Sequence, residues 1–285
     1  MKETMKKIIF TFLLMLSSNI AMAQKIEILP TSTLKGPQGV VANAVVDLSK
    51  SAGFNITATQ KNSCGEAVDY FENAKGPIAI VWSDSMIKNT VITKQNCTIN
   101  FEKASAIAVT YAPYEVCVLK GFKLEPNKTY KLGNNKFNPA GTILQHLNTN
   151  KEGIKFTDVT YESSATVVTG LLNREIEVGY TATSNVSNAI KSGSIDCLYT
   201  TGATKYGQKF LSEFAEKSQL NDYKLGMMVF AKNLSAEQID RLQKSLEKGF
   251  ATIMTQQDMV GSKIAPNKTD IDQFISTAKL YGTYN

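Results

Sequence analysis

The chain has 285 residues, of which 20% are charged, and a net charge of +6 at pH 7. This length suits two modest α/β lobes or one large domain. The basic residues are scattered, with no dense run and no interleaved aromatic residues, so the composition argues against nucleic-acid binding. One histidine and four cysteines without a CxxC pair argue against a bound metal, and we expect no cofactor.

The first residues have the three-part organisation of a secretory signal peptide. Three lysines precede an apolar run over 8–16 and the small-residue pattern Ala-Met-Ala over 21–23. The apolar run is far shorter than the roughly 20 residues that span a bilayer. We therefore expect residues 1–23 to be a signal peptide that is cleaved after Ala23, which places the mature protein in the periplasm. The alternative, an amphipathic first helix of a cytosolic domain, fits this pattern less well.

The four cysteines form an even set, which in an exported protein predicts disulfides. They are Cys64, Cys97, Cys117 and Cys197. Four cysteines allow three pairings, and their spacing alone does not choose among them.

After the signal peptide, strand and helix patterns alternate in two series. The first series has strand patterns over 25–29, 55–59, 77–82 and 104–111, and helix patterns over 40–51 and 66–73. A strand over 114–119 follows Pro113, and the alternation then repeats. The second series has strand patterns over 129–132, 155–161, 177–182 and 196–200, and helix patterns over 139–147, 165–172 and 186–192.

The remaining chain is longer than the second series needs. It has a polar helix pattern over 206–217, a strand over 223–231, an amphipathic helix over 235–255 and a last helix over 270–280. Strands that alternate with helices predict mainly parallel sheets whose carboxyl-end loops form a ligand crevice. Two sheets joined by crossings near 112–113 and 203–221 would bring both sets of loops to one cleft.

The stretch from Lys131 to Thr201 resembles the second lobe of the substrate-binding receptors of tripartite tricarboxylate transporters, the Bug-type receptors. It reads KLGNNKFNPAGTILQHL and then FTDVTYESSATVVTGLLNREIEVGYTATSNVSNAIKSGSIDCLYTTG, and it keeps the family's order and spacing over about 70 residues. The later segment MMVFAKNLSAEQIDRLQKSLEKGF is also similar to the family. The first loop, over 31–39, departs from it, because it lacks a Gly-Gly pair and has Gln38 near the position of the family's Asp.

The resemblance implies an α/β protein with a type II periplasmic-binding-protein fold, in which two mixed five-stranded sheets form two lobes around a ligand cleft. On that plan, lobe 1 comprises residues 24–113 and 221–285, lobe 2 comprises residues 114–204, and residues 205–220 form a crossing segment.

The same plan implies a disulfide pairing. The strand over 114–119 would pair antiparallel with the strand over 196–200, which makes Cys117 and Cys197 cross-strand neighbours. Cys64 and Cys97 would then pair with each other in loops of lobe 1. Two buried free thiols in the second lobe are the alternative.

The resemblance also implies the function of an extracytoplasmic receptor that is not an enzyme. Such a receptor captures a small carboxylated metabolite between its lobes and delivers it to an integral membrane permease, and we expect it to be a monomer. Because only two of the 31 basic residues are arginines, backbone N–H groups at helix starts and hydroxyl groups would hold the carboxylate in place of an ion pair.

The resemblance places candidate ligand residues in strand-end loops of both lobes. Lobe 1 would contribute Thr31, Ser32, Thr33, Gly36, Gln38, Gly39, Ser83 and Asp84. Lobe 2 would contribute Asn134, Asn135, Asn138, Thr142, Tyr161, Ser163, Ser164, Ala165, Thr181 and Thr183, and Ser184 would face the same cleft. Many of these residues could instead be ordinary helix caps or turn residues. Asp84 would repel a carboxylate unless it binds a hydroxyl or an amine of the ligand. We expect Trp82 in the core and Arg174 on the surface.

Two other functions remain open. An exported serine hydrolase is suggested by Ser-x-x-Lys at Ser32, Ser85 and Ser276, but the chain has neither Lys-Thr-Gly nor Gly-x-Ser-x-Gly, and His146 is its one histidine. A sensory ligand-binding component would share the receptor fold and differ only in its membrane partner.

Overall fold

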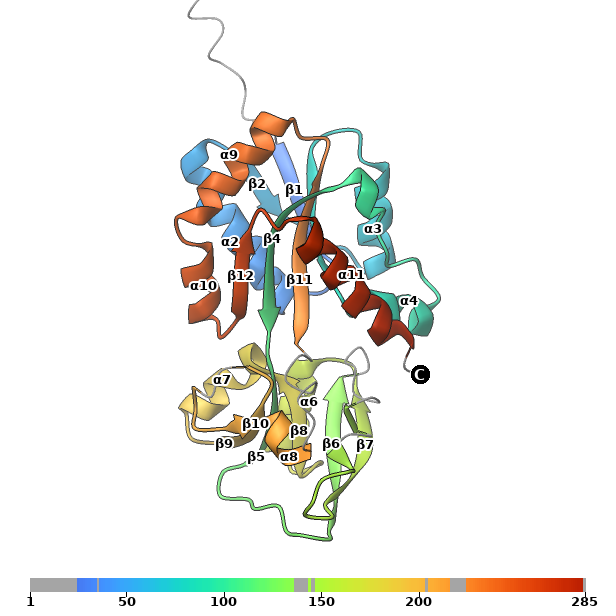
Figure 1. The fold of residues 1–285 in the computed structure, drawn as a ribbon, viewed down its shortest axis with the longest axis vertical. Coiled ribbons are helices and arrows are strands. Elements are labelled where there is room, and N and C mark those ends of the chain that lie inside the picture. Colours follow the sequence, from blue (N-terminus) through green and yellow to red (C-terminus); the bar gives the residue numbers. More distant parts are fainter. Residues whose placement is uncertain are drawn as a thin grey trace, which may run out of the picture.

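The computed structural model describes residues 25–34, 36–135, 143–144, 147–202, 205–215 and 224–283. The predicted signal peptide and most of the predicted helix over 139–147 lie outside these residues. The described residues form two six-stranded sheets, each flanked by helices, and the two sheets lie one beyond the other along the long axis of the molecule (Figure 1). We call the part built on the first sheet lobe 1 and the part built on the second sheet lobe 2.

The sheet of lobe 1 has the strand order β12-β4-β11-β3-β1-β2. Its strands are β1 (Lys25–Pro30), β2 (Asn55–Ala58), β3 (Ile78–Ser83), β4 (Ser105–Ala112), β11 (Leu225–Lys232) and β12 (Val260–Ile264). The central strand β3, IAIVWS, is buried along its whole length, because helices cover both faces of the sheet and both sets of alternating side chains enter a core.

Helices from distant parts of the chain cover the two faces of this sheet (Figure 1). One core contains side chains of α2 (Pro37–Ser49), α9 (Ala236–Glu247) and α10 (Phe250–Gln256). The opposite core contains side chains of α3 (Cys64–Asn73), α4 (Met86–Thr93) and α11 (Lys268–Thr283). Two short 3-10 helices, η1 (Lys50–Ala52) and η2 (Phe101–Lys103), complete the lobe. Trp82 is fully buried in the second core, as predicted.

The sheet of lobe 2 has the strand order β10-β9-β5-β8-β6-β7. Its strands are β5 (Tyr114–Leu119), β6 (Thr129–Asn135), β7 (Lys155–Tyr161), β8 (Val178–Ala182), β9 (Ile195–Thr200) and β10 (Lys209–Phe210). Its helices are α6 (Ser164–Leu172), α7 (Thr183–Lys191) and α8 (Leu211–Ala215). Arg174 follows α6 and is exposed, as predicted.

Strand direction brings the carboxyl ends of both sheets to the junction between the lobes. In lobe 1, β1 to β4 share one direction and β11 and β12 run against them. In lobe 2, β6 to β10 share one direction and β5 runs against them. Only Pro113 separates the end of β4 from the start of β5. The carboxyl ends of β1 to β4 therefore face the carboxyl ends of β6 to β10 across the junction (Figure 1).

The α/β class and the two-lobed fold are confirmed, but each sheet has six strands where five were expected. The additional strands are β12 at the edge of lobe 1 and the two-residue β10 at the edge of lobe 2. The short apolar pattern of β12, VGSKI, contains a glycine and a lysine, which weakened its strand signal.

Two helix predictions also differ from the structure, and one helix was not predicted. The predicted helix over 206–217 is instead a turn, the strand β10 and the short helix α8, and Leu211 and Phe214 of α8 pack in the core of lobe 2. The predicted helix over 235–255 breaks at Gly249 into α9 and α10. Helix α4 was not predicted, because its apolar residues are interrupted by Lys, Asn and Thr.

The chain crosses between the lobes twice. The first crossing is at Pro113, as predicted, and the second lies between Ala215 of α8 and Leu225 of β11. Leu225 packs against the cores of both lobes. Among the described residues, no helix is long and apolar enough to span a membrane.

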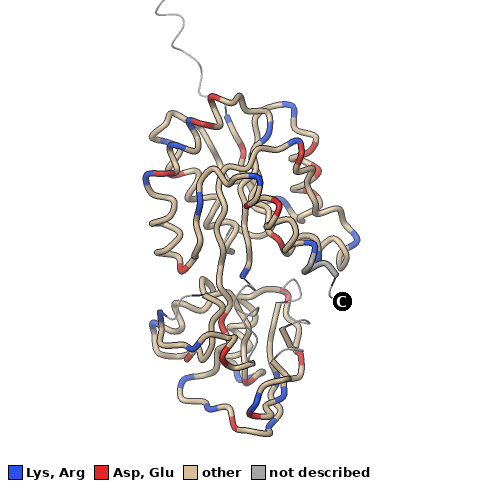
Figure 2. Tube along the Cα trace, viewed as in Figure 1, with Lys and Arg blue, Asp and Glu red and all other residues tan. Residues whose placement is uncertain are grey.

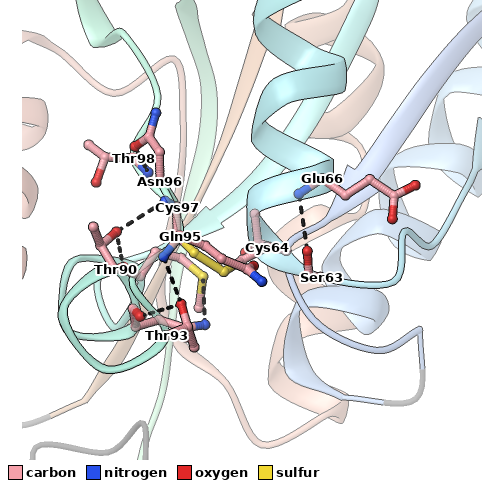
Figure 3. Close-up of a disulfide and its surroundings, with 12 residues drawn as sticks. Ser63, Cys64, Glu66, Thr90, Thr93, Gln95, Asn96, Cys97 and Thr98 are labelled. Atoms are coloured by element: carbon pink, nitrogen blue, oxygen red, sulfur yellow. Dashed lines mark hydrogen bonds between the residues drawn. A yellow bond between two sulfur atoms is a disulfide. The ribbon is translucent and has the colours of Figure 1, made fainter.

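Both predicted disulfides are present. Cys117 and Cys197 face each other in the antiparallel β5–β9 pair. Cys64 at the start of α3 is bonded to Cys97 in the loop after α4 (Figure 3). That loop is also fixed by hydrogen bonds from the Cys97 amide to Thr90 Oγ1 (3.1 Å) and from the Trp82 indole to the Cys97 carbonyl (2.7 Å).

Candidate functional site

The loop after β1 and the strand end of β3 are joined by a buried hydrogen-bond network. Gln38 lies in the first turn of α2 and is 3% exposed. Its amide nitrogen donates to Ser83 Oγ (2.7 Å) and to Thr31 Oγ1 (3.2 Å). The Thr31 hydroxyl donates to the Val81 carbonyl (3.1 Å). Gln38 therefore fixes the loop after β1 against β3. A shorter side chain would not reach both hydroxyl groups, and a carboxylate could not donate to them.

The rest of this loop is more open. Ser32 and Thr33 are exposed, and Gly36 precedes α2 with its amide donating to the Thr33 carbonyl (3.1 Å). A Cβ at Gly39 would lie 2.1 Å from the Leu34 carbonyl oxygen, so only glycine allows this close approach of helix and loop.

Ser83 ends β3, Asp84 follows it, and both are buried. Asp84 Oδ2 accepts the Gly226 amide (2.7 Å), which fixes the start of β11 against the end of β3. Burial raises the pKa of Asp84 well above its usual value, and the hydrogen bond from Gly226 opposes that shift. The shift makes the neutral form of Asp84 more accessible than it is for an exposed aspartate.

In lobe 2, the strand end of β6 has an amide next to a carboxylate. Asn134 is 2% exposed, and its amide nitrogen donates to Asp158 Oδ1 in β7. Asn135 is the last residue of β6 and is half-buried. The predicted ligand residues Asn138 and Thr142 lie outside the described residues.

The loop from β7 to α6 supplies a helix cap. Ser163 is the N-cap of α6 and forms a reciprocal capping box with Thr166. Ser164 and Ala165 open the helix, and the Ser164 carbonyl accepts the Thr181 hydroxyl (3.2 Å). Tyr161 donates its hydroxyl to Glu175 (3.2 Å), beyond the carboxyl end of α6. The structure therefore brings Ser163, Ser164 and Thr181 together and directs the Tyr161 hydroxyl away from them.

Thr183 contacts Glu115, a buried residue that was not predicted from the sequence. Its hydroxyl donates to Glu115 Oε1 (2.7 Å) and to the Pro113 carbonyl (3.2 Å). Glu115 is 1% exposed, and it also accepts from Thr200 (3.1 Å) and Gln208 (3.1 Å). Burial raises the pKa of Glu115 to about 7, although its three hydrogen bonds oppose that shift. The sequence does contain a signal for this residue, because Glu115 is the one charged residue in the apolar strand YEVCVL.

Among the buried side-chain atoms without a hydrogen-bond partner in the described residues, four follow facing strand ends. Asp84 Oδ1 and Asn89 Oδ1 follow β3 in lobe 1, and Ser184 Oγ and Asn185 Nδ2 follow β8 in lobe 2. Buried polar atoms are nearly always paired, so an unpaired set calls for a specific explanation such as a ligand or water. Asp84 and Ser184 were among the candidates predicted from the sequence, whereas Asn89 and Asn185 were not.

Charges also approach each other across the junction. Lys88 in α4 of lobe 1 is half-buried, which lowers its pKa, and the negative charge of Asp158 in β7 of lobe 2 opposes that shift. Figure 2 shows basic and acidic residues interspersed along the described parts of both lobes.

Among the described residues, no group of three or more His, Cys, Asp or Glu side chains is placed to hold a metal ion. An open groove of about 720 Å³ runs between the η2 region and α11, with Ile99, Phe101, Ile271 and Ile275 in its lining. This groove contains none of the predicted ligand residues.

Two sheets joined by two crossings, with facing strand ends, define a type II periplasmic-binding-protein fold. The chain is similar to a TctC solute-binding protein from Polaromonas, with 15% identity, a TM-score of 0.65, and coverage of 92% of this chain and 98% of that one. It is also similar to two Rhodopseudomonas palustris proteins. One, MatC with bound malate, has 14% identity, a TM-score of 0.64 and coverage of 92% and 100%. The other, solved with adipate, has 14% identity, a TM-score of 0.68 and coverage of 93% and 99%. No family model and no curated protein matches the sequence.

Proposed function

We propose that this protein is an extracytoplasmic solute-binding receptor that holds a small carboxylate between its lobes and delivers it to a membrane permease, without catalysis. The observation that carries the proposal is the set of unpaired buried atoms after β3 and β8, on the facing ends of the two lobes. Two disulfides among the described residues support an oxidising compartment, in agreement with the predicted signal peptide and a periplasmic location. We expect the receptor to act as a monomer.

The unpaired atoms of lobe 2 suit a carboxylate. Ser184 Oγ and Asn185 Nδ2 can both donate, and both residues lie in the first turn of α7, a nine-residue helix whose amino end attracts negative charge. The unpaired oxygens of Asp84 and Asn89 in lobe 1 suit a hydrogen-bond donor on the ligand. The structures similar to this chain include one with malate and one with adipate, which makes these two dicarboxylates the first ligands to test.

Isothermal titration calorimetry with malate and adipate tests the proposal, after a thermal-shift screen over mono-, di- and tricarboxylates. We expect at least one carboxylate to bind, and Ser184→Ala to weaken its binding roughly 10-fold, since a hydrogen bond to a charged group contributes about 1.5 kcal/mol or more. Ser192→Ala is the matched control, because Ser192 is exposed at the other end of α7. The proposal is wrong if no carboxylate binds.

A further inference from the structure

A chain of hydrogen bonds joins the two lobes beside the first crossing, and none of its members was a predicted ligand residue. It begins at Glu115 of β5, whose Oε2 accepts from the Gln208 amide nitrogen (3.1 Å). Gln208 Oε1 in turn accepts the backbone amide of Tyr206 (2.8 Å). Gln208 is 5% exposed, so this part of the chain is shielded from water.

The chain then passes from lobe 2 to lobe 1. The Tyr206 hydroxyl donates to Asp258 Oδ2 (3.0 Å), and Lys205 Nζ lies 2.5 Å from Asp258 Oδ1. Lys205 and Tyr206 lie between β9 and β10, two strands of lobe 2, whereas Asp258 lies between α10 and β12 of lobe 1. The ion pair thus links residues 53 apart in sequence and belonging to different lobes.

Asp258 lies close to the first crossing, so its contacts act near the point about which the lobes can rotate. Val260, two residues later, pairs with Tyr111 near the end of β4, one residue before Ala112 and the crossing at Pro113. The side chain of Asp258 is only 5% exposed, whereas that of Lys205 is 52% exposed. The carboxylate is therefore held in a buried position, where solvent screens its interactions less than those of a fully exposed pair.

We propose that Asp258 is a positioning residue that ties the Lys205–Tyr206 turn of lobe 2 to lobe 1 and so limits how far the lobes separate. We call the contacts of Asp258 with Lys205 and Tyr206 the hinge tether. The two chain crossings already join the lobes, and the hinge tether adds a side-chain attachment between them near the Pro113 crossing. Gln208 and Glu115 hold the turn in the position from which it reaches Asp258.

Limiting the separation of the two lobes would favour ligand capture. The expected effect of the hinge tether on binding therefore rests on the proposed function. A receptor whose open state is wider or more populated has a lower population of the binding-competent state, and its apparent affinity falls in proportion. Without the hinge tether, the ligand has to supply the part of the free energy of reaching the binding-competent state that the tether otherwise contributes.

Asp258→Asn tests the tether with little disturbance of the backbone. Asp258 has φ of 60°, a left-handed conformation that asparagine also adopts readily, so the substitution changes the charge without adding backbone strain. Tyr206→Phe is a second variant that removes only one hydroxyl. Asp240→Asn is the matched control, since Asp240 pairs with Lys244 within α9 and is 60% exposed.

Two measurements separate the tether from the proposed function. Small-angle scattering of the ligand-free protein should give a larger radius of gyration for Asp258→Asn than for wild type or Asp240→Asn, with Tyr206→Phe in between. Calorimetry with malate or adipate should show a roughly 5-fold loss of affinity for Asp258→Asn at unchanged stoichiometry. An unchanged or smaller radius overturns the tether even if a carboxylate binds. A larger radius supports the tether even if neither dicarboxylate binds, and that second result would count against the proposed function alone.

Discussion

At the scale of single residues, Glu115 makes stability depend on pH. Burial raises its pKa in the folded protein from 4.5 to about 7. As the pH rises from 4.5, the unfolded chain loses the proton of this carboxyl first, so the folded state loses relative stability until both forms are ionised above pH 7. We expect this one group to lower the free energy of unfolding by about 3 kcal/mol across that interval.

Glu115→Gln checks this expectation, because glutamine keeps the side-chain size and an oxygen that can accept from Thr183 and Thr200. Urea unfolding at pH 5, 6, 7 and 8 gives the free energy of unfolding for each protein. The difference between variant and wild type should grow in favour of the variant from pH 5 to pH 8, and other titrating groups cancel in that difference. A difference that is independent of pH would mean that Glu115 is ionised in the folded protein throughout.

Residues also differ in how far the sequence could identify them. Gln38, Ser83 and Thr31 were identified because the resemblance places ligand residues in the loops after apolar strands, and the structure brings them together in one network. Their function as ligand residues stays a prediction. Asn89, Asn185 and Asp258 were not found, because an Asn or Asp in a helix or turn is common and its importance comes from burial, which depends on the tertiary packing.

At the scale of elements, buried strands were predictable and segments with weak apolar signals were not. β5 and β7 have the predicted bounds, because a run of apolar or alternating residues between turn residues indicates a strand locally. Helix α4 and strand β12 depend on contacts with α11 and β4, which lie elsewhere in the chain, and their own sequences are mixed. The break at Gly249 between α9 and α10 is another such case, because the apolar period continues across it.

The two disulfides join elements at different sequence separations, which predicts an order of stabilisation. Cys64–Cys97 spans 33 residues and Cys117–Cys197 spans 80. Restricting the unfolded chain stabilises the fold more for the longer loop, by about 3.7 and 4.5 kcal/mol respectively in the chain-entropy relation. We expect the double variant Cys117→Ala with Cys197→Ala to unfold at lower urea concentration than Cys64→Ala with Cys97→Ala. The reverse order would indicate that native packing around the Cys64–Cys97 bridge outweighs loop entropy.

At the scale of the whole molecule, the facing strand ends predict that ligand binding draws the lobes together. Both lobes present unpaired buried polar atoms at the junction, so a ligand that satisfies atoms of both lobes binds the closed arrangement more tightly than an open one. The two crossings allow such a rotation without unfolding either core. Scattering with a saturating carboxylate should therefore give a smaller radius of gyration than scattering of the ligand-free protein. Ser184→Ala, at the same ligand concentration, should show less contraction because fewer molecules are occupied. A carboxylate that binds without any contraction would mean that one lobe alone holds the ligand.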